Sequence, residues 1–265
     1  ALAAAASDNH QVEGDEVAFN AMTATTRVGN RTQISRKAVI VSGTLESVSK
    51  AGRNNEMAYQ ISKASKELKR DMETTLLLNQ APVTGNDTTA RKLAGIETWI
   101  ATNTNKASAG SPTPADPTGD GTDVRVVGTQ RAFTEAQLKD VVKKCWDSGG
   151  DPSMIMLGSF NKQKLSGFTG GSTRFDPAEN KRLVASVDIY ESDFGALTAV
   201  PNRFQQARSA YVLQPDMWAV SFLRDFQLAD LAQSGDAQKK FLLAEYTFES
   251  RNQAASGGIF DLTTS

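Results

Sequence analysis

Residues 54–80 read NNEMAYQISKASKELKRDMETTLLLNQ. Charged side chains are frequent in this stretch, and its apolar or small residues recur at intervals of three and four. These are Met57, Ile61, Ala64, Leu68, Met72, Thr75 and Leu76. This spacing places them in one narrow stripe on an α-helix and leaves the other faces polar. We therefore predict a helix over Asn54–Gln80, about 40 Å long at 1.5 Å per residue. A long helix with so thin an apolar stripe favours an architectural role over a catalytic one.

The residues at both ends of this stretch support the same helix. Asn54 or Asn55 can cap its amino terminus, and Glu56 in the first turn suits the positive end of the helix dipole. Pro82 disfavours helical geometry at the residue before it and is expected to end the helix.

A basic segment precedes the helix. Gly29-Asn30 suits a two-residue turn, so we predict a β-hairpin with strands over Met22–Val28 and Arg31–Val41. An isolated two-stranded hairpin is barely stable in water, so another part of the structure must hold it. Its basic residues indicate either contact with phosphate or an acidic partner, or simply a solvated hairpin. They are Arg27, Arg31, Arg36 and Lys37.

The chain after the helix alternates between strand-like and helical patterns. We predict a short strand over Leu93–Ile100 and an exposed loop over Thr102–Asp123. Thr134 and Gln137 form a capping box that starts a helix, which Gly149-Gly150 ends. One apolar face of that helix is expected to carry Leu138, Val141, Val142, Cys145 and Trp146.

From Ser153 onward the chain is expected to be mostly strands, with one short helix over Phe160–Leu165. The predicted strands are Ser153–Leu157, Leu183–Ile189, Ala196–Val200, Ala210–Leu213, Trp218–Leu223, Lys239–Glu249 and Ile259–Leu262. Without a regular βαβ repeat, this pattern predicts a mixed α+β fold.

Composition excludes several classes of protein. The 265 residues suffice for one large domain or two modest ones. A net charge of -1 argues against a nucleic-acid binder with a dominant basic field. No apolar run approaches the ~20 residues of a membrane span, so no membrane contact is expected. The single cysteine, Cys145, and single histidine, His10, cannot form an intrachain disulfide or a zinc site of such ligands.

Three patterns suggest chemistry, and each has a simpler interpretation. Asp193-Phe194-Gly195 matches the metal-binding tripeptide of kinases, but the other kinase motifs are missing, so a turn between strands is favoured. Cys145 as a nucleophile would need a base such as His10, and its place on an apolar helix face favours burial. The aspartates of one loop resemble a loose calcium site without EF-hand spacing, and a solvated loop is favoured; they are Asp116, Asp120 and Asp123.

Several longer stretches resemble one known family. They are RVGNRTQISRKAVIVSGT (27–44), AGRNNEMAYQISKASKELKRDME (51–73), RKLAGIETWI (91–100), YESDFG (190–195), PNRF (201–204) and LAQSGDAQKKFLLAEYTFESRN (231–252). Together with the order of arm, basic hairpin, long helix and mixed α+β part, they resemble the major capsid protein of tailed bacteriophages, with the Hong Kong 97-type fold. The resemblance runs in order along nearly the whole chain.

The resemblance implies a division of the chain into named parts. Residues 1–18 would be the N-arm, 19–52 the E-loop, and 53–133 the spine helix with the first part of the P-domain. Residues 134–235 would be the A-domain, and 236–265 the carboxyl-terminal part of the P-domain. Because the chain does not begin with methionine, we also expect a preceding segment, either removed by maturation cleavage or disordered.

The resemblance also implies a function. The chain would assemble with other copies of itself into hexamers and pentamers of an icosahedral shell around double-stranded DNA. Portal, scaffolding or decoration proteins are further expected partners, the host cytoplasm is the expected place of assembly, and no catalytic residue, cofactor or metal is expected. The alternatives are a non-viral nanocompartment shell of the same fold and a soluble enzyme that uses Cys145. The expected subunit-interface residues are Arg27, Asn30, Arg31, Arg36 and Lys37.

Overall fold

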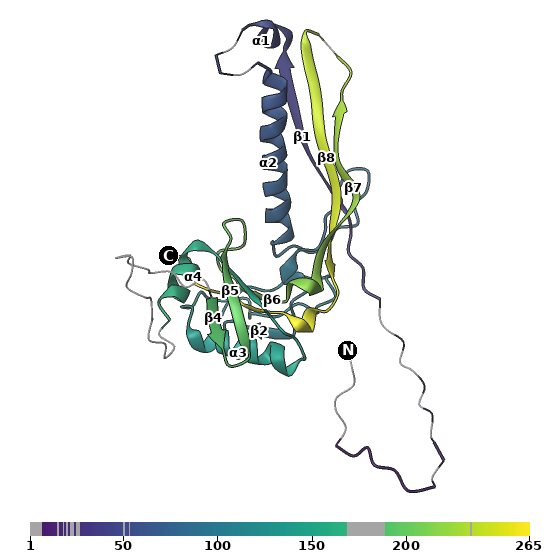
Figure 1. Cartoon of the computed structure of the whole chain (residues 1–265), viewed down its shortest axis with the longest axis vertical. Coiled ribbons are helices and arrows are strands. Elements are labelled where there is room, and N and C mark those ends of the chain that lie inside the picture. The colour runs from purple at the N-terminus through teal and green to yellow at the C-terminus, as the bar shows by residue number, and fades with distance from the viewer. Residues whose placement is uncertain are drawn as a thin grey trace, which may run out of the picture.

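The computed structural model has an elongated arm that stands on a broader body (Figure 1). It describes residues 7–14, 16, 17, 19, 21, 24, 27–49, 51, 52, 54–168, 189–233 and 235–265. The elements in chain order are β1 (Gln33–Ser42), α1 (Gly43–Ser47), α2 (Glu56–Leu76), η1 (Ile96–Thr98), β2 (Asn103–Asn105), α3 (Glu135–Asp147), β3 (Met154–Leu157), α4 (Ser159–Ser166), β4 (Ile189–Ser192), β5 (Gly195–Pro201), β6 (Ala210–Leu213), η3 (Pro215–Met217), β7 (Trp218–Asp230), β8 (Ala237–Ser250), η4 (Gln253–Ala255) and β9 (Gly257–Ile259). The arm combines α2 with a three-stranded sheet of order β1-β8-β7. The body contains a six-stranded sheet of order β2-β9-β6-β3-β5-β4 together with α3 and α4.

The predicted long helix is confirmed as α2, although it is shorter than expected. Asn55 caps it, and its Oδ1 accepts a hydrogen bond from the Ala58 backbone N–H at 2.6 Å. The predicted stripe is buried at four positions, Met57, Ala64, Leu68 and Met72. The expected end at Gln80 is wrong, because Leu77 caps the helix and turns into the core, where it is 7% exposed. The helix therefore ends where Leu77 is buried, before the chain reaches Pro82.

The predicted hairpin at Gly29-Asn30 is wrong. β1 pairs antiparallel with β8 over all ten residues, from Gln33 opposite Tyr246 to Ser42 opposite Ala237. No strand includes Arg27–Thr32, and Gly29 lacks the positive φ that a type I′ turn requires. The part of the other predicted strand at 22, 23, 25 and 26 lies outside the described residues. Pairing with β8, a long strand with many apolar residues, therefore determines the position of β1 more strongly than the local turn signal at Gly29-Asn30 does.

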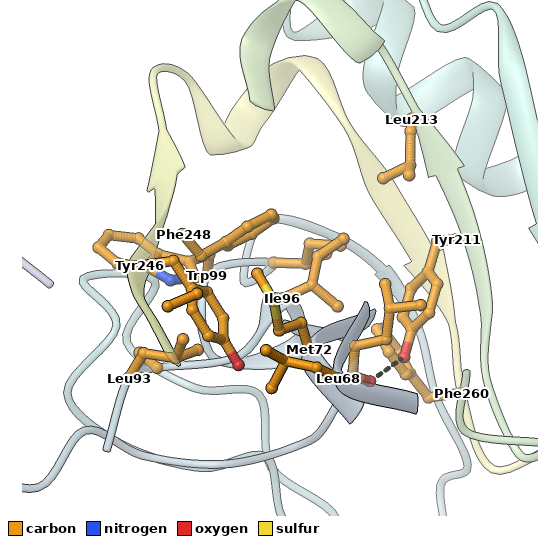
Figure 2. Packing of buried hydrophobic residues seen from close by; sticks show 14 of the residues in the cluster. Leu68, Met72, Leu93, Ile96, Trp99, Tyr211, Leu213, Tyr246, Phe248 and Phe260 are labelled. Carbon is orange, nitrogen blue, oxygen red and sulfur yellow. Dashed lines mark hydrogen bonds between the residues drawn. The ribbon is translucent and has the colours of Figure 1, made fainter. Parts of the chain in front are cut away.

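The described residues form two hydrophobic cores, and β6 separates them. Tyr211 and Leu213 of β6 point into the first core, which joins the arm to the body (Figure 2). Ala210 and Val212 point into the second core, under α3. Successive side chains of a strand face opposite sides of a sheet, so one four-residue strand serves both cores. The first core also includes Leu68, Met72, Leu93, Ile96, Trp99, Tyr246, Phe248 and Phe260.

A buried arginine fixes the long connection between η1 and α3. The Arg125 side chain is 1% exposed, and its Nη2 donates a hydrogen bond to the Ile100 carbonyl at 2.6 Å. Its Nη1 forms an ion pair with Asp116, and its guanidinium lies 3.5 Å from the ring centroid of Phe260. The expected exposed loop over Thr102–Asp123 is therefore wrong in part, since Asp116 is tied to the core and β2 pairs with β9.

Two further expectations, both based on local sequence patterns, are wrong. Leu93–Ile100 is not a strand but contains η1, and all eight of its residues are buried. Trp146 is not buried with the apolar face of α3, since it is 57% exposed and contacts Phe194 at a ring-centroid distance of 5.3 Å. Both expectations relied on local periodicity, which does not show which side the rest of the chain covers.

Most of the other predicted elements are confirmed, with small shifts of their ends. β7 runs on to Asp230, beyond the predicted end at Leu223, and the strand predicted over Ile259–Leu262 overlaps β9 only at Ile259. The capping box at Thr134 and Gln137 starts α3, and Gly195 follows the turn between β4 and β5. The predicted strand over 183–188 lies outside the described residues, and β4 begins at Ile189. β9 belongs to the sheet of the body, beside β6 and β2.

Candidate assembly interface

The sheet of the arm turns one face to α2 and the other away from it. Along β1 the side chains alternate, with Ser35 and Lys37 on the α2 side and Ile34, Arg36 and Ile40 on the outer side. Ile34 is 47% and Ile40 64% exposed, which is unusual for isoleucine in a strand. The outer face of β1 is thus a mixture of apolar and basic side chains that nothing covers in the described part of the chain.

The five expected interface residues divide into two groups. Arg27, Arg31 and Arg36 have exposed side chains. Asn30 and Lys37 also make side-chain contacts within their own chain, and their place in an interface stays a prediction. The Asn30 side chain donates to the Phe248 carbonyl at 3.0 Å and accepts from the Ala94 backbone N–H at 2.8 Å. Lys37 Nζ lies 2.6 Å from Asp71 on α2.

A buried carboxylate on β8 ties three segments of the arm together. The side chain of Glu245 is 4% exposed. It accepts a hydrogen bond from Thr32 Oγ1 at 2.7 Å and from Arg224 Nε of β7 at 2.8 Å, and it forms an ion pair with Arg91. The hydrogen bond from Thr32, and then the charged partners, hold the pKa of Glu245 below its usual value of 4.5. This network keeps the strands of the arm in register.

Glu245 makes the stability of the arm depend on pH. Because the folded state lowers the pKa of this carboxyl, its contribution is fully present above about pH 4.5 and is lost as the pH falls through the folded-state pKa. We expect Glu245→Gln to flatten the decline of unfolding free energy between about pH 5 and pH 3, measured by urea denaturation of unassembled chains. Glu249→Gln, at a more exposed position of the same strand, is the matched control and should change this slope less. An unchanged slope in Glu245→Gln would contradict the assignment.

Exposed apolar side chains gather on the arm and were missed by the sequence interpretation. β7 has apolar residues on both faces, and this was the signal that could have found them. A strand with one face in water normally alternates apolar and polar residues. The exposed large apolar residues of the arm are Ile34, Ile40, Leu45, Val48, Tyr59, Val220, Phe222, Leu223, Leu228 and Leu231. An exposed apolar patch marks a site of contact with another protein, and these side chains are candidates for such a patch.

The candidate catalytic and calcium residues do not form a reactive site. Cys145 is fully buried, and burial raises the pKa of its thiol to about 12. His10 contacts Asp8, at 2.9 Å. Asp120 accepts hydrogen bonds from Thr118 and Thr122 of its own loop. Among the described residues, no three histidine, cysteine, aspartate or glutamate side chains are grouped as metal ligands. None of the described helices is both long and apolar enough to span a membrane.

Comparison with known proteins identifies the family. The family model for the SU10 major capsid protein matches residues 1–263. The chain belongs to the SU10 major capsid protein family. This SU10-family protein is 28% identical to the major capsid protein of Escherichia phage Phieco32 over 295 aligned positions, which cover 98% of this chain and 83% of that protein.

Solved structures agree on the fold of this SU10-family protein. The cyanophage A-1(L) capsid matches with a TM-score of 0.61 at 14% identity, over 88% of this chain and 78% of that one. The procapsid of satellite phage P4 matches with 0.57 at 8% identity, over 97% and 80%. The SrpI encapsulin of Synechococcus elongatus matches with 0.53 at 10% identity, over 88% and 75%. At these identities the likeness concerns the fold alone, and the predicted Hong Kong 97-type α+β fold is confirmed. The predicted function as a tailed-phage major capsid protein is confirmed by the family and by the curated relative.

Proposed function

We propose that this capsid protein assembles into hexamers and pentamers of an icosahedral shell that encloses double-stranded DNA. The uncovered surface of the arm is the observation that supports this proposal. Its apolar outer residues and the open edges of β1 and β7 have no cover in the described part of the same chain. Open sheet edges and apolar patches invite pairing with another chain. Neighbouring copies in a closed shell would supply that cover.

The division of the chain predicted from the resemblance remains part of this proposal. α2 would be the spine helix, the sheet of the arm would belong to the E-loop and P-domain, and α3 to β6 would form the A-domain. Because β9 pairs with β6, residues near 257–259 would contribute to the A-domain as well. We propose a purely structural role without catalysis, assembly in the host cytoplasm, and portal, scaffolding or decoration proteins as further partners.

Three exposed arginines are the proposed contacts of the arm with a neighbouring copy. Arg31 is a suitable test, because within the described part of the chain only its backbone makes hydrogen bonds: its N–H donates to Asn30 at 2.8 Å and its carbonyl accepts from Thr247 at 2.9 Å. The side chains of Arg27 and Arg36 are exposed in the same way. An acidic surface, such as the amino-terminal segment of a neighbour with Glu13, would complement them.

Arg31→Glu is expected to block particle assembly while the chain stays folded. Reversed charge at a contact suppresses association, and an exposed side chain contributes little to folding. Sedimentation would separate particles from free subunits, and circular dichroism with thermal melting would report folding. Arg31→Lys keeps the charge and should assemble. Normal particles from Arg31→Glu would contradict this contact.

The proposed cargo needs its own measurement. Particles purified from infected cells should hold double-stranded DNA that resists added nuclease until the shell is opened. A packaged enzyme in place of DNA would indicate a nanocompartment, the alternative that the encapsulin likeness raises at the level of fold alone.

A further inference from the structure

We infer that the two ends of the six-stranded sheet bind each other between copies of this chain, with the acidic β4–β5 turn of one copy entering the basic pocket beside β2 of the next. This inference rests on the proposed ring-shaped capsomers and names the surfaces that close them. The two ends of this sheet, at β4 and at β2, differ in charge, and this difference supports the inference.

The β4 end of the sheet is acidic and apolar. β4 is the outermost described strand there, and its turn to β5 presents the exposed Asp193. Glu191 on β4 and Asp151 nearby are also exposed, and none of these three carboxylates has an ion-pair partner within the described ranges. Ile189 is 60% and Trp146 57% exposed at the same end. This surface combines exposed carboxylates with apolar side chains, and the cation near enough to act on Asp193 is Lys139 of α3, which forms its ion pair with Glu135.

The β2 end of the sheet is hollow and basic. A pocket of about 640 Å³ opens beside β2, and its cationic side chains are Lys106, Arg131 and Lys144. Lys106 pairs with Asp116, and Lys144 with Asp140.

Arg131 supplies a third positive charge to this pocket, with Asp140 and Asp261 near enough to attract it. Its Nε and Nη2 lie 3.3 Å from the Phe260 carbonyl, and no carboxylate of the described residues forms an ion pair with it. Gln130 beside it lines the pocket and is exposed. The pocket is therefore suited to an incoming carboxylate, which an arginine fork binds well.

Helix α3 separates the two surfaces, so they cannot meet within one chain. Glu135 at its start binds Tyr190 of β4 at 3.1 Å, whereas Asp140 and Lys144 of the same helix bind Asn105 and the Thr104 carbonyl of β2. The helix thus contacts strands at both ends of the sheet. Complementary surfaces at different places on one subunit form a heterologous contact, and repetition of this contact closes a ring when the rotation allows it.

The proposed contact also gives a role to the tripeptide Asp193-Phe194-Gly195. Neither kinase chemistry nor the fold itself requires this sequence. Asp193 makes no hydrogen bond in the described part of the chain, and Phe194 supports the turn by packing on Trp146. Gly195 adopts φ 139°, which lets the chain turn sharply and leaves Asp193 at the tip. The turn is short and firmly held, as an inserting element needs to be.

A cysteine pair tests the contact directly. We expect shells of the full chain with Asp193→Cys and Gln130→Cys to form covalent oligomers of up to five or six chains upon mild oxidation, seen by electrophoresis without reductant. Each single-cysteine variant should remain monomeric on the gel, because the native Cys145 is fully buried. Assembled shells of the double variant that yield only single chains would overturn the inference.

A charge swap tests it when the cysteine pair does not assemble. We expect Asp193→Lys to reduce particle yield at least tenfold with unchanged melting, and Gln130→Glu in the same chain to restore it by facing the new lysine. Normal yield from Asp193→Lys, or loss without restoration, would overturn the inference. The unaltered chain is assembled in parallel as a control. If it forms shells, a negative result with the variants counts against this contact alone. If it forms none, the proposed shell function itself fails.

Discussion

Leu68→Ala is expected to lower the free energy of unfolding by about 3 kcal/mol, since burial of this leucine joins the arm to the body. Leu68 is 1% exposed and belongs to the first core, together with Tyr246 of β8 and Tyr211 of β6. Truncation removes apolar contacts and leaves a cavity that a junction between two rigid units cannot easily close. The loss would be a large part of the ~5–15 kcal/mol that stabilises a typical domain. Denaturant unfolding of unassembled chains measures it.

Leu223→Ala provides the matched control for this prediction. Leu223 lies on β7 and is 66% exposed, so the same truncation should cost less than about 1 kcal/mol of folding stability. If neighbouring subunits cover β7, however, it should reduce particle yield. Equal losses of stability for the two leucines would contradict the assignment of Leu68 to the joint.

Asp261→Ala is expected to cost about 3–5 kcal/mol, because one buried carboxylate holds the connection between η1 and α3. Its Oδ1 accepts a hydrogen bond from the Gly128 N–H at 2.6 Å, and its Oδ2 accepts one from the Ala107 N–H at 3.1 Å. Arg208 Nη2 lies 3.6 Å from Oδ1. Alanine would leave two backbone donors without their acceptor. Alanine also lacks the polar side chain that helps aspartate to adopt φ 62°, so part of the ~1–2 kcal/mol cost of this backbone region would no longer be offset.

Asp261→Asn separates these two contributions. Asparagine tolerates positive φ and keeps one carbonyl oxygen, so we expect a loss of about 1–2 kcal/mol. Hydrogen exchange should show faster exchange at Ala107 and Gly128 in Asp261→Ala than in Asp261→Asn. Thermal melting gives the overall stability. Protected amides at both positions in Asp261→Ala would show that another group holds this connection.

Local signals predicted those parts of the fold that are decided locally. The stripe of α2, the capping box at Thr134 and the turn before Gly195 depend on neighbours within a few residues, and all three are confirmed. The family was predictable from longer stretches such as residues 231–252, which follow β7 and include β8. The burial of Cys145 followed from its place on the apolar face of α3.

Pairings distant in sequence could not be predicted in this way. Asn30 looked like a turn residue, yet it binds Ala94 and Phe248, far along the chain. The partner of β1 lies about 200 residues away, and no periodicity announces it. No local pattern singles out Glu245 within the predicted strand Lys239–Glu249. Only the assembled sheet shows that Thr32 and Arg224 meet there.

Copies of this protein should close into a shell through surfaces that a single copy leaves uncovered. Electron microscopy of the purified full chain is the most direct test of this closure. We expect uniform closed particles, tens of nanometres across, whose maps resolve five-fold and six-fold rings with the arm of each copy lying on a neighbour. A stable, dispersed monomer at the concentrations used for assembly would contradict it.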